Sequence, residues 1–198
     1  MLALTAALAI ASLVPLFLTP FLPLTDLGSS IGAAGLIDDL VRGVEPVSTR
    51  YRLNPTLLPY WTGYVVMAVL EALFGALFAV KATVALCVVL LPLSVMRLMI
   101  ALGRSPRLGL WAFLFAWDLN MTLGWFTFQL GMALALWAIA WMLEVKKDED
   151  CTPIVFLLAL IGLTHLHAVA LVGLVGLGLA WKTPRWIAMS LSGLLILV

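Results

Sequence analysis

The sequence predicts an all-α, polytopic transmembrane helical bundle of about seven crossings, with an outer-face loop that contains interfacial helices. Of the 198 residues, 64% are hydrophobic and only 11% are charged, whereas roughly 25% are charged in an ordinary soluble domain. The few charges are bunched between long apolar runs. Such runs need lipid around them, so the composition excludes a water-soluble fold.

Apolar runs of membrane-spanning length make up most of the chain, since about 20 residues cross the hydrocarbon as a helix. These runs are 2–24, 60–80, 82–102, 108–143, 154–181 and 186–198. The run 108–143 would be roughly 54 Å long as one helix. Asp118, Asn120 and Gly124 interrupt it near the middle. We therefore expect it to break there and to cross twice.

The run 154–181 leaves two arrangements open. It would be roughly 42 Å long as one helix, and His165 and His167 lie at its midpoint. Length alone fits either one long tilted helix or two short helices that meet at the histidines.

The whole chain, 1–198, is predicted to be a single transmembrane domain. Its first segment, 1–24, is predicted to be a retained membrane helix, because it lacks the basic start of a secretory signal and continues through two prolines. We expect 25–80 to form the outer loop and 81–198 to supply the remaining membrane helices. The last run is apolar to its final residue, so we expect the chain to be, or to resemble, the N-terminal part of something longer.

A long polar connection, 25–59, follows the first predicted helix. A connection of this length in a compact chain is more often functional than idle. Between Ser29 and Val44 its apolar side chains have helical spacing, and Ser29 or Ser30 is expected to be the N-cap. This pattern favours an amphipathic helix at the membrane surface.

The distribution of basic residues restricts the topology, because cytoplasmic loops carry an excess of Lys and Arg. We consider an arrangement with a cytoplasmic N-terminus, 60–80 lying against the outer interface, and both long runs crossing twice. Its cytoplasmic side then holds Arg97, Arg104, Arg107, Lys146, Lys147, Lys182 and Arg185, and most acids and both histidines collect on the outer face. A competing arrangement, with 60–80 spanning, 154–181 as one helix and the N-terminus outside, obeys the same rule. Charge counting leaves both open.

Several classes of function have no support in the sequence. A net charge of +1 without a basic run excludes the electrostatics of nucleic-acid binding. Two cysteines do not by themselves make a disulfide scaffold or a zinc site. No glycine-rich phosphate loop, HExxH motif, GxSxG motif or internal repeat is present. Familiar soluble-enzyme chemistry is therefore not expected.

Asp26 is the candidate catalytic residue. It lies at the outer end of the first predicted helix, where two prolines fix the exit of the chain. A carboxylate at such a boundary sits in reduced dielectric, which suits it to accept a proton from a hydroxyl or to hold a divalent metal ion. The alternative is a solvated acid just past a helix end.

Four other side chains are candidates for substrate binding: Asp38, Asp39, His165 and His167. On a helix the two adjacent acids point about 100° apart, so a solvated face with a local ion pair to Arg42 is the simpler interpretation. The two histidines would share one side of an extended segment but not of a helix. Polar groups in so apolar a run are costly, which favours a function. Metal binding by this pair alone is less favoured, because hard divalent cations prefer oxygen.

Short motifs occur in a characteristic order along nearly the whole chain. They are Pro-Leu-Thr-Asp at 23–26, a Pro-rich tract before Tyr60-Trp61, Arg97 and Gly103-Arg104, Asn120 followed by Gly124-Trp125-Phe126, Gly131-Met-Ala-Leu-Ala-Leu, and Thr164-His165-Leu166. Together they resemble bacterial membrane proteins of the GT-C glycosyltransferase superfamily, of which this chain would represent the N-terminal core of about seven helices.

The resemblance implies a polytopic enzyme of the bacterial inner membrane that transfers a sugar from a polyprenyl-phosphate carrier to an acceptor at the extracytoplasmic face. In that family an acid in the first outer loop activates the acceptor or helps to hold a metal, and Asp26 lies at the matching place. His165 matches a histidine common at the corresponding outer turn. Relatives often carry a histidine four residues after the acid, where this chain has Ser30. The resemblance also favours the arrangement with a cytoplasmic N-terminus.

Two other classes of function stay open. A non-enzymatic membrane subunit that packs against larger membrane partners would suit the serine at position 30. A transporter element is less favoured, because no inverted repeat is visible and the charges gather at one face instead of the midplane. An outer cavity lined by Asp26 and His165 is expected of the enzyme. A flat surface there is expected of the subunit, and a polar path between both faces is expected of the transporter.

Overall fold

The computed structural model of the chain describes residues 1–54, 59–145 and 152–180, and throughout these residues its regular structure is helical, without strands. The helices are α1 (Leu2–Leu13), α2 (Pro15–Leu18), α3 (Leu27–Arg42), α4 (Val47–Arg50), α5 (Trp61–Phe74), α6 (Ala76–Ala101), the 3-10 helix η1 (Pro106–Phe115), α7 (Leu119–Leu123), α8 (Phe126–Glu144), α9 (Thr152–Thr164) and α10 (Leu166–Ala180). The predicted all-α class is therefore confirmed for the described residues.

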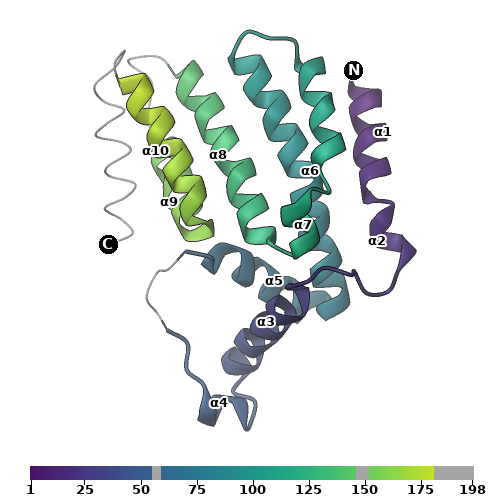
Figure 1. Cartoon of the computed structure of the whole chain (residues 1–198). Coiled ribbons are helices and arrows are strands. Elements are labelled where there is room, and N and C mark those ends of the chain that lie inside the picture. The colour runs from purple at the N-terminus through teal and green to yellow at the C-terminus, as the bar shows by residue number, and fades with distance from the viewer. Residues whose placement is uncertain (55–58, 146–151, 181–198) are drawn as a thin grey trace.

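Most of the helices form a bundle, and the others lie at one end of it. Helices α1, α6, α8 and α10 run side by side (Figure 1). Helix α6 packs against η1 and α8, and α8 packs against α9 and α10. Helices α3, α4 and α5 lie beyond the lower end of the bundle in Figure 1, and the N-terminus lies at the upper end. We call the end next to α3–α5 the loop end and the opposite end the Arg104 end.

Two apolar clusters hold these helices together. The first joins α3, α5, α6 and the start of α8, and includes the fully buried side chains of Met67, Val84 and Val88. The second joins α8, α9 and α10, and includes Ile161 and Val172. Helix α8 joins the two clusters, because its first part belongs to one and its later part to the other.

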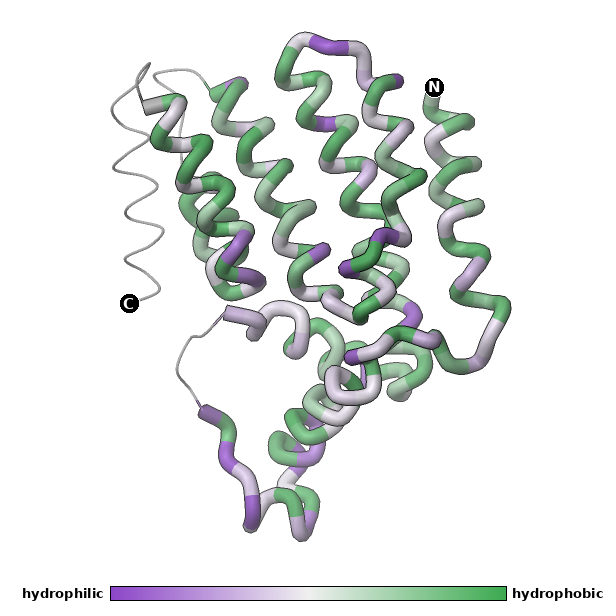
Figure 2. The backbone as a smooth tube through the Cα atoms, in the orientation of Figure 1, coloured by the Kyte–Doolittle hydropathy of each residue, from purple (hydrophilic) through white to green (hydrophobic). Residues whose placement is uncertain are grey.

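Two helices, α6 and α8, are long and apolar enough to cross a membrane, and α1–α2, α5, α9 and α10 are shorter apolar helices. Many large apolar side chains on the bundle are exposed, among them Ile10, Phe17, Trp111, Leu114, Phe156 and Leu174. Figure 2 shows hydrophobic residues along the whole height of the bundle. Such a surface is typical of contact with lipid or with other proteins. The described residues therefore hold two candidate crossings, fewer than the seven predicted, because the other helices are shorter than the roughly 20 residues that span a bilayer.

The polar break predicted in the run 108–143 occurs, and the run 154–181, for which two arrangements were open, is also divided. The run 108–143 divides between η1 and α8, and the short helix α7 occupies the break. The Asp118 carboxylate begins α7 by accepting the Met121 N–H at 2.9 Å, and Gly124 ends it with φ +85°. The run 154–181 is a pair of helices that meet at His165, which contradicts the single long helix of the competing arrangement.

Two helix ends differ from their predicted positions. The first run does not continue as a helix to residue 24, since α2 ends at Leu18 and Thr19 is extended. A residue before a proline is biased away from the helical region, and Pro20 follows. The run 60–80 ends as a helix at Phe74, because Gly75 has φ +86° and breaks the chain direction. Residues 76–80 therefore belong to α6 and not to the outer loop.

The predicted surface helix in the polar connection is present as α3, but its predicted N-cap was wrong. Asp26 occupies the N-cap position, and the hydroxyls of Ser29 and Ser30 donate back to the Asp26 carbonyl oxygen at 2.8 and 3.1 Å. The helix starts earlier than its apolar spacing indicated, because Leu27 in its first turn is buried in the core.

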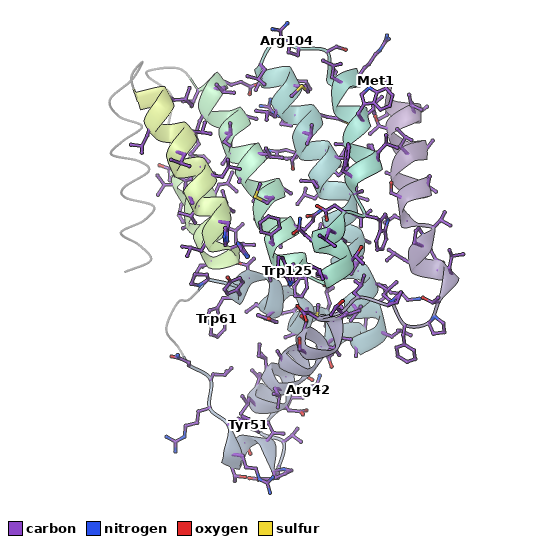
Figure 3. All side chains as sticks on the ribbon, viewed as in Figure 1. Met1, Arg42, Tyr51, Trp61, Arg104 and Trp125 are labelled. Atoms are coloured by element: carbon purple, nitrogen blue, oxygen red, sulfur yellow. The ribbon has the colours of Figure 1, made fainter. Side chains whose placement is uncertain are left out.

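The charged groups are divided between the two ends. Arg104 and Met1 lie at one end of the bundle, and Trp125 and Trp61 lie toward the other (Figure 3). Near the Arg104 end, both terminal guanidinium nitrogens of Arg97 bond the Glu144 carboxylate and tie α6 to α8. The four other basic residues predicted to be cytoplasmic from 146 onward lie outside the described residues, as do the predicted cytoplasmic loop at 146–150 and the run 186–198.

Candidate functional site

A cavity of about 550 Å³ opens at the loop end, where α3, α5, the α7–α8 turn and the α9–α10 turn meet. The polar residues that line it are Asp26, Ser29, Ser30, Tyr60, Tyr64, Asn120, Thr127, His165 and His167. Trp125, Phe126 and Phe128 supply apolar wall, and neither lysine nor arginine lines it among the described residues. This volume lies within the range of small-molecule sites in proteins.

Main-chain contacts fix the position of Asp26. Its N–H donates to the Leu123 carbonyl oxygen at 2.9 Å, and the Thr25 N–H donates to the Thr122 carbonyl oxygen at 3.3 Å. A side chain at Gly124 would come within 3.1 Å of the Asp26 nitrogen. The α7–α8 turn can therefore close on Asp26 only because a glycine stands at position 124.

The carboxylate of Asp26 is held by one of its two oxygens. The Trp125 indole N–H donates to Oδ2 at 3.0 Å, whereas Oδ1 has no donor among the described residues. Asp26 also lies at the N-terminus of α3, where the helix dipole favours a negative charge. One carboxylate oxygen is thus anchored, and the other is available to a ligand in the cavity.

The two histidines belong to the turn between α9 and α10. The His165 side chain is buried, and the rings of Tyr60 and Phe128 meet it edge-on at centroid distances of 4.9 and 5.1 Å. The His167 N–H donates to His165 Nδ1 at 3.2 Å. Burial, together with the neighbouring His167, lowers the pKa of His165 below its usual value of 6.5. His165 is therefore a neutral imidazole at physiological pH.

Asp38 and Asp39 lie further along α3 and do not line the cavity. Asp38 pairs with Arg42 at 2.8 Å, which is the local ion pair that the simpler interpretation predicted. Both acids lie close to Glu71 of α5. Burial, followed by the charges of Asp38 and Asp39, raises the pKa of Glu71. The structure thus brings Asp26, His165 and His167 together and leaves Asp38 and Asp39 outside.

Most side chains of the cavity were not predicted as site residues, among them Tyr60, Tyr64, Asn120 and Trp125. Asn120 lies in a polar break, which was a usable signal. Trp125 contributes a single polar group, the indole N–H, and this role has no sequence signature. The tyrosines contribute only through the crossing of α5 over the end of α8.

The donor set of the cavity does not favour a metal site at Asp26. Among the described residues, Asp26 is the only carboxylate that lines the cavity, and they hold no group of three or more His, Cys, Asp or Glu side chains suited to a metal. Divalent metals in proteins take several oxygen or nitrogen ligands. The geometry fits a base better than a metal ligand.

Three comparisons with known proteins found no relative. No protein-family model matches the chain, and neither a curated protein nor a solved structure matches it.

Proposed function

We propose that the chain is an integral membrane glycosyltransferase-like enzyme, similar to the GT-C superfamily, which transfers a sugar from a polyprenyl-phosphate carrier to a hydroxyl acceptor. The observation that carries this proposal is the cavity at the loop end in which Asp26 and His165 meet. A hollow of this size can hold a sugar-sized ligand, whereas a subunit that only packs against partners would have a flat face there.

The proposed location is a bacterial-type inner membrane, with several crossings and a cytoplasmic N-terminus. The exposed apolar side chains of the bundle support burial in lipid, and Arg97 and Arg104 near the other end support a cytoplasmic assignment of that end. Helices α3 and α5 would then lie at the outer interface. Seven crossings would include the shorter helices, which a bilayer accommodates by local thinning.

The boundary position of the cavity suits the two substrates of such an enzyme. A polyprenyl-phosphate sugar keeps its chain in the hydrocarbon and its head at the interface, and the acceptor arrives from the aqueous side. The cavity is lined by residues of α3 and by the α9–α10 turn of the apolar bundle. Asp26 therefore lies at the proposed boundary between the hydrocarbon and the aqueous side.

Asp26 is assigned the role of general base. Its Oδ1 takes the proton of the acceptor hydroxyl, the hydroxyl oxygen forms a bond to the anomeric carbon of the sugar, and the bond from that carbon to the carrier phosphate oxygen breaks. The phosphate leaves with the bonding electron pair. Trp125 holds Oδ2, so that one defined oxygen faces the acceptor. A positioned base contributes roughly 10²–10⁴-fold to a rate.

The Asp26→Asn variant tests this assignment. In inner-membrane vesicles supplied with a radiolabelled polyprenyl-phosphate sugar and a hydroxyl acceptor, we expect label transfer to fall about 100-fold or more. Glu45→Gln, the same chemical change at an exposed acid before α4, is the control and should transfer at the wild-type rate. If Asp26→Asn transferred label at the wild-type rate, the assignment of Asp26 as the general base would be refuted. If the wild-type protein transferred label from none of a panel of such donors, the proposed glycosyltransferase activity would be refuted.

A further inference from the structure

The α9–α10 turn holds the imidazole ring of His165 in one tautomer. A backbone N–H is always a donor, so the His167 N–H at 3.2 Å requires Nδ1 of His165 to carry a lone pair. In a neutral imidazole the proton then resides on Nε2. The protein backbone, rather than a ligand, thus selects the tautomer.

The position of the ring is also restricted. Tyr60 and Phe128 meet it at interplanar angles of 86°. Helix α8 approaches the turn closely, because a side chain at Gly131 would come within 2.9 Å of His165 Cβ. His165 Nε2 has no partner among the described residues, and it is not among the buried polar atoms left without one. The N–H therefore remains accessible in the cavity that the ring lines.

The same hydrogen bond has a structural role. His167 is the second residue of α10, and a side chain that accepts its N–H acts as a helix cap. This role uses Nδ1 only. It does not account for the donor on Nε2, because asparagine would cap the helix equally well.

We propose that His165 is a fixed hydrogen-bond donor of the cavity, whose Nε2–H recognises an oxygen atom of the bound substrate. This inference rests on the proposed function and deepens it. In this tautomer neither ring nitrogen offers a free lone pair, so His165 is neither a second base nor a metal ligand. The oxygen belongs either to the carrier phosphate or to a hydroxyl of the sugar or acceptor. Both kinds of oxygen accept a hydrogen bond from Nε2–H.

The tautomer can be measured without any enzyme assay. The chain contains two histidines, so ¹⁵N-histidine labelling gives two sets of ring signals, and His167→Asn assigns them. At neutral pH we expect His165 to show an unprotonated Nδ1 and a protonated Nε2. A protonated Nδ1 or a charged ring at pH 7 would overturn the inference, whether or not the protein transfers sugar.

Two variants separate the donor from the cap. The asparagine of His165→Asn keeps an oxygen that can accept the His167 N–H, but it lacks the donor at Nε2. The glutamine of His165→Gln is longer, and its amide nitrogen can replace Nε2 as the donor. We expect His165→Asn to unfold at the wild-type temperature and to raise KM about tenfold, the loss of about one hydrogen bond. His165→Gln should recover part of that loss. A change confined to the donor KM identifies the phosphate or the sugar, and one confined to the acceptor KM identifies its hydroxyl. Wild-type KM for both substrates in folded His165→Asn would overturn the inference.

Discussion

The position of Asp26 depends on a residue without a side chain. Gly124 has φ +85°, and an added Cβ would lie 3.1 Å from the backbone nitrogens of Asp26 and Leu27. Those atoms belong to the main chain and cannot rotate away. The contact between the α7–α8 turn and the start of α3 therefore tolerates only glycine at this position.

We expect Gly124→Ala to destabilise the protein by about 1–2 kcal/mol from the left-handed backbone alone, with a further loss from the displaced Asp26. Thermal unfolding in detergent measures the change. The matched control is Gly173→Ala, since Gly173 lies inside α10 with nothing within 4 Å of an added Cβ. The control should be neutral or slightly stabilising. Equal melting temperatures for Gly124→Ala and the wild type would contradict the close contact.

At the scale of elements, the contact between α3 and α5 contains the carboxyl group of Glu71, whose charged form is poorly stabilised there. Glu71 Oε2 is buried and has no hydrogen-bond partner within the part of the chain that the structure describes, and Oε1 would lie 3.2 Å from a Cβ added at Gly35. Burial first, and then the charges of Asp38 and Asp39, raises the pKa of Glu71 above its usual 4.5. The charged form is therefore disfavoured in the folded state.

The contribution of Glu71 to stability depends on pH. Because its folded pKa is raised, the folded state holds the proton more tightly, and stability is lost as pH rises from 4.5 through the raised pKa. We expect Glu71→Gln to stabilise the protein by on the order of 1 kcal/mol at neutral pH, and this gain should disappear toward pH 4.5. Denaturation at a series of pH values measures it, with Glu45→Gln as the exposed control. A gain independent of pH would point to some other cause.

At the scale of the whole molecule, the proposed orientation depends on how the basic residues divide between the two ends of the bundle. The Arg104 end holds Arg97, Arg104 and Arg107, and the loop end holds Arg42, Arg50, Arg52 and Lys81. The proposal that the cavity lies outside the cytoplasm therefore also counts the basic residues at 146, 147, 182 and 185 of the sequence.

Cysteine accessibility tests this orientation. In a chain with Cys87 and Cys151 replaced, we expect Thr49→Cys on α4 to react with a membrane-impermeant maleimide on intact cells. Ser105→Cys at the Arg104 end should react only after permeabilisation. Both positions are exposed, so both should react in permeabilised cells. If Ser105→Cys reacted on intact cells and Thr49→Cys only after permeabilisation, both the proposed topology and the GT-C proposal would be refuted.

Part of the site could be predicted from the sequence. His165 was identifiable because it is a polar group in an apolar run, where such groups are costly unless they serve a purpose. Asp26, which is exposed in the structure, was identifiable from its place at the end of the first predicted helix. Their partners were not identifiable in the same way. Trp125 contributes one N–H, and Tyr60 reaches the cavity only because α5 turns away from α6 at Gly75.

The sequence by itself determined the helical class and the position of the break at Asp118–Gly124, and it left the break at His165 as one of two alternatives. The reason is local, because an apolar segment in lipid must pair its backbone groups within its own helix, and polar residues or glycine end it. Only the tertiary structure decided that the α7–α8 turn and the α9–α10 turn lie at the same cavity. The cavity depends on how α5, α8 and the α9–α10 turn cross, and these contacts join residues far apart in the chain, which local periodicity does not encode.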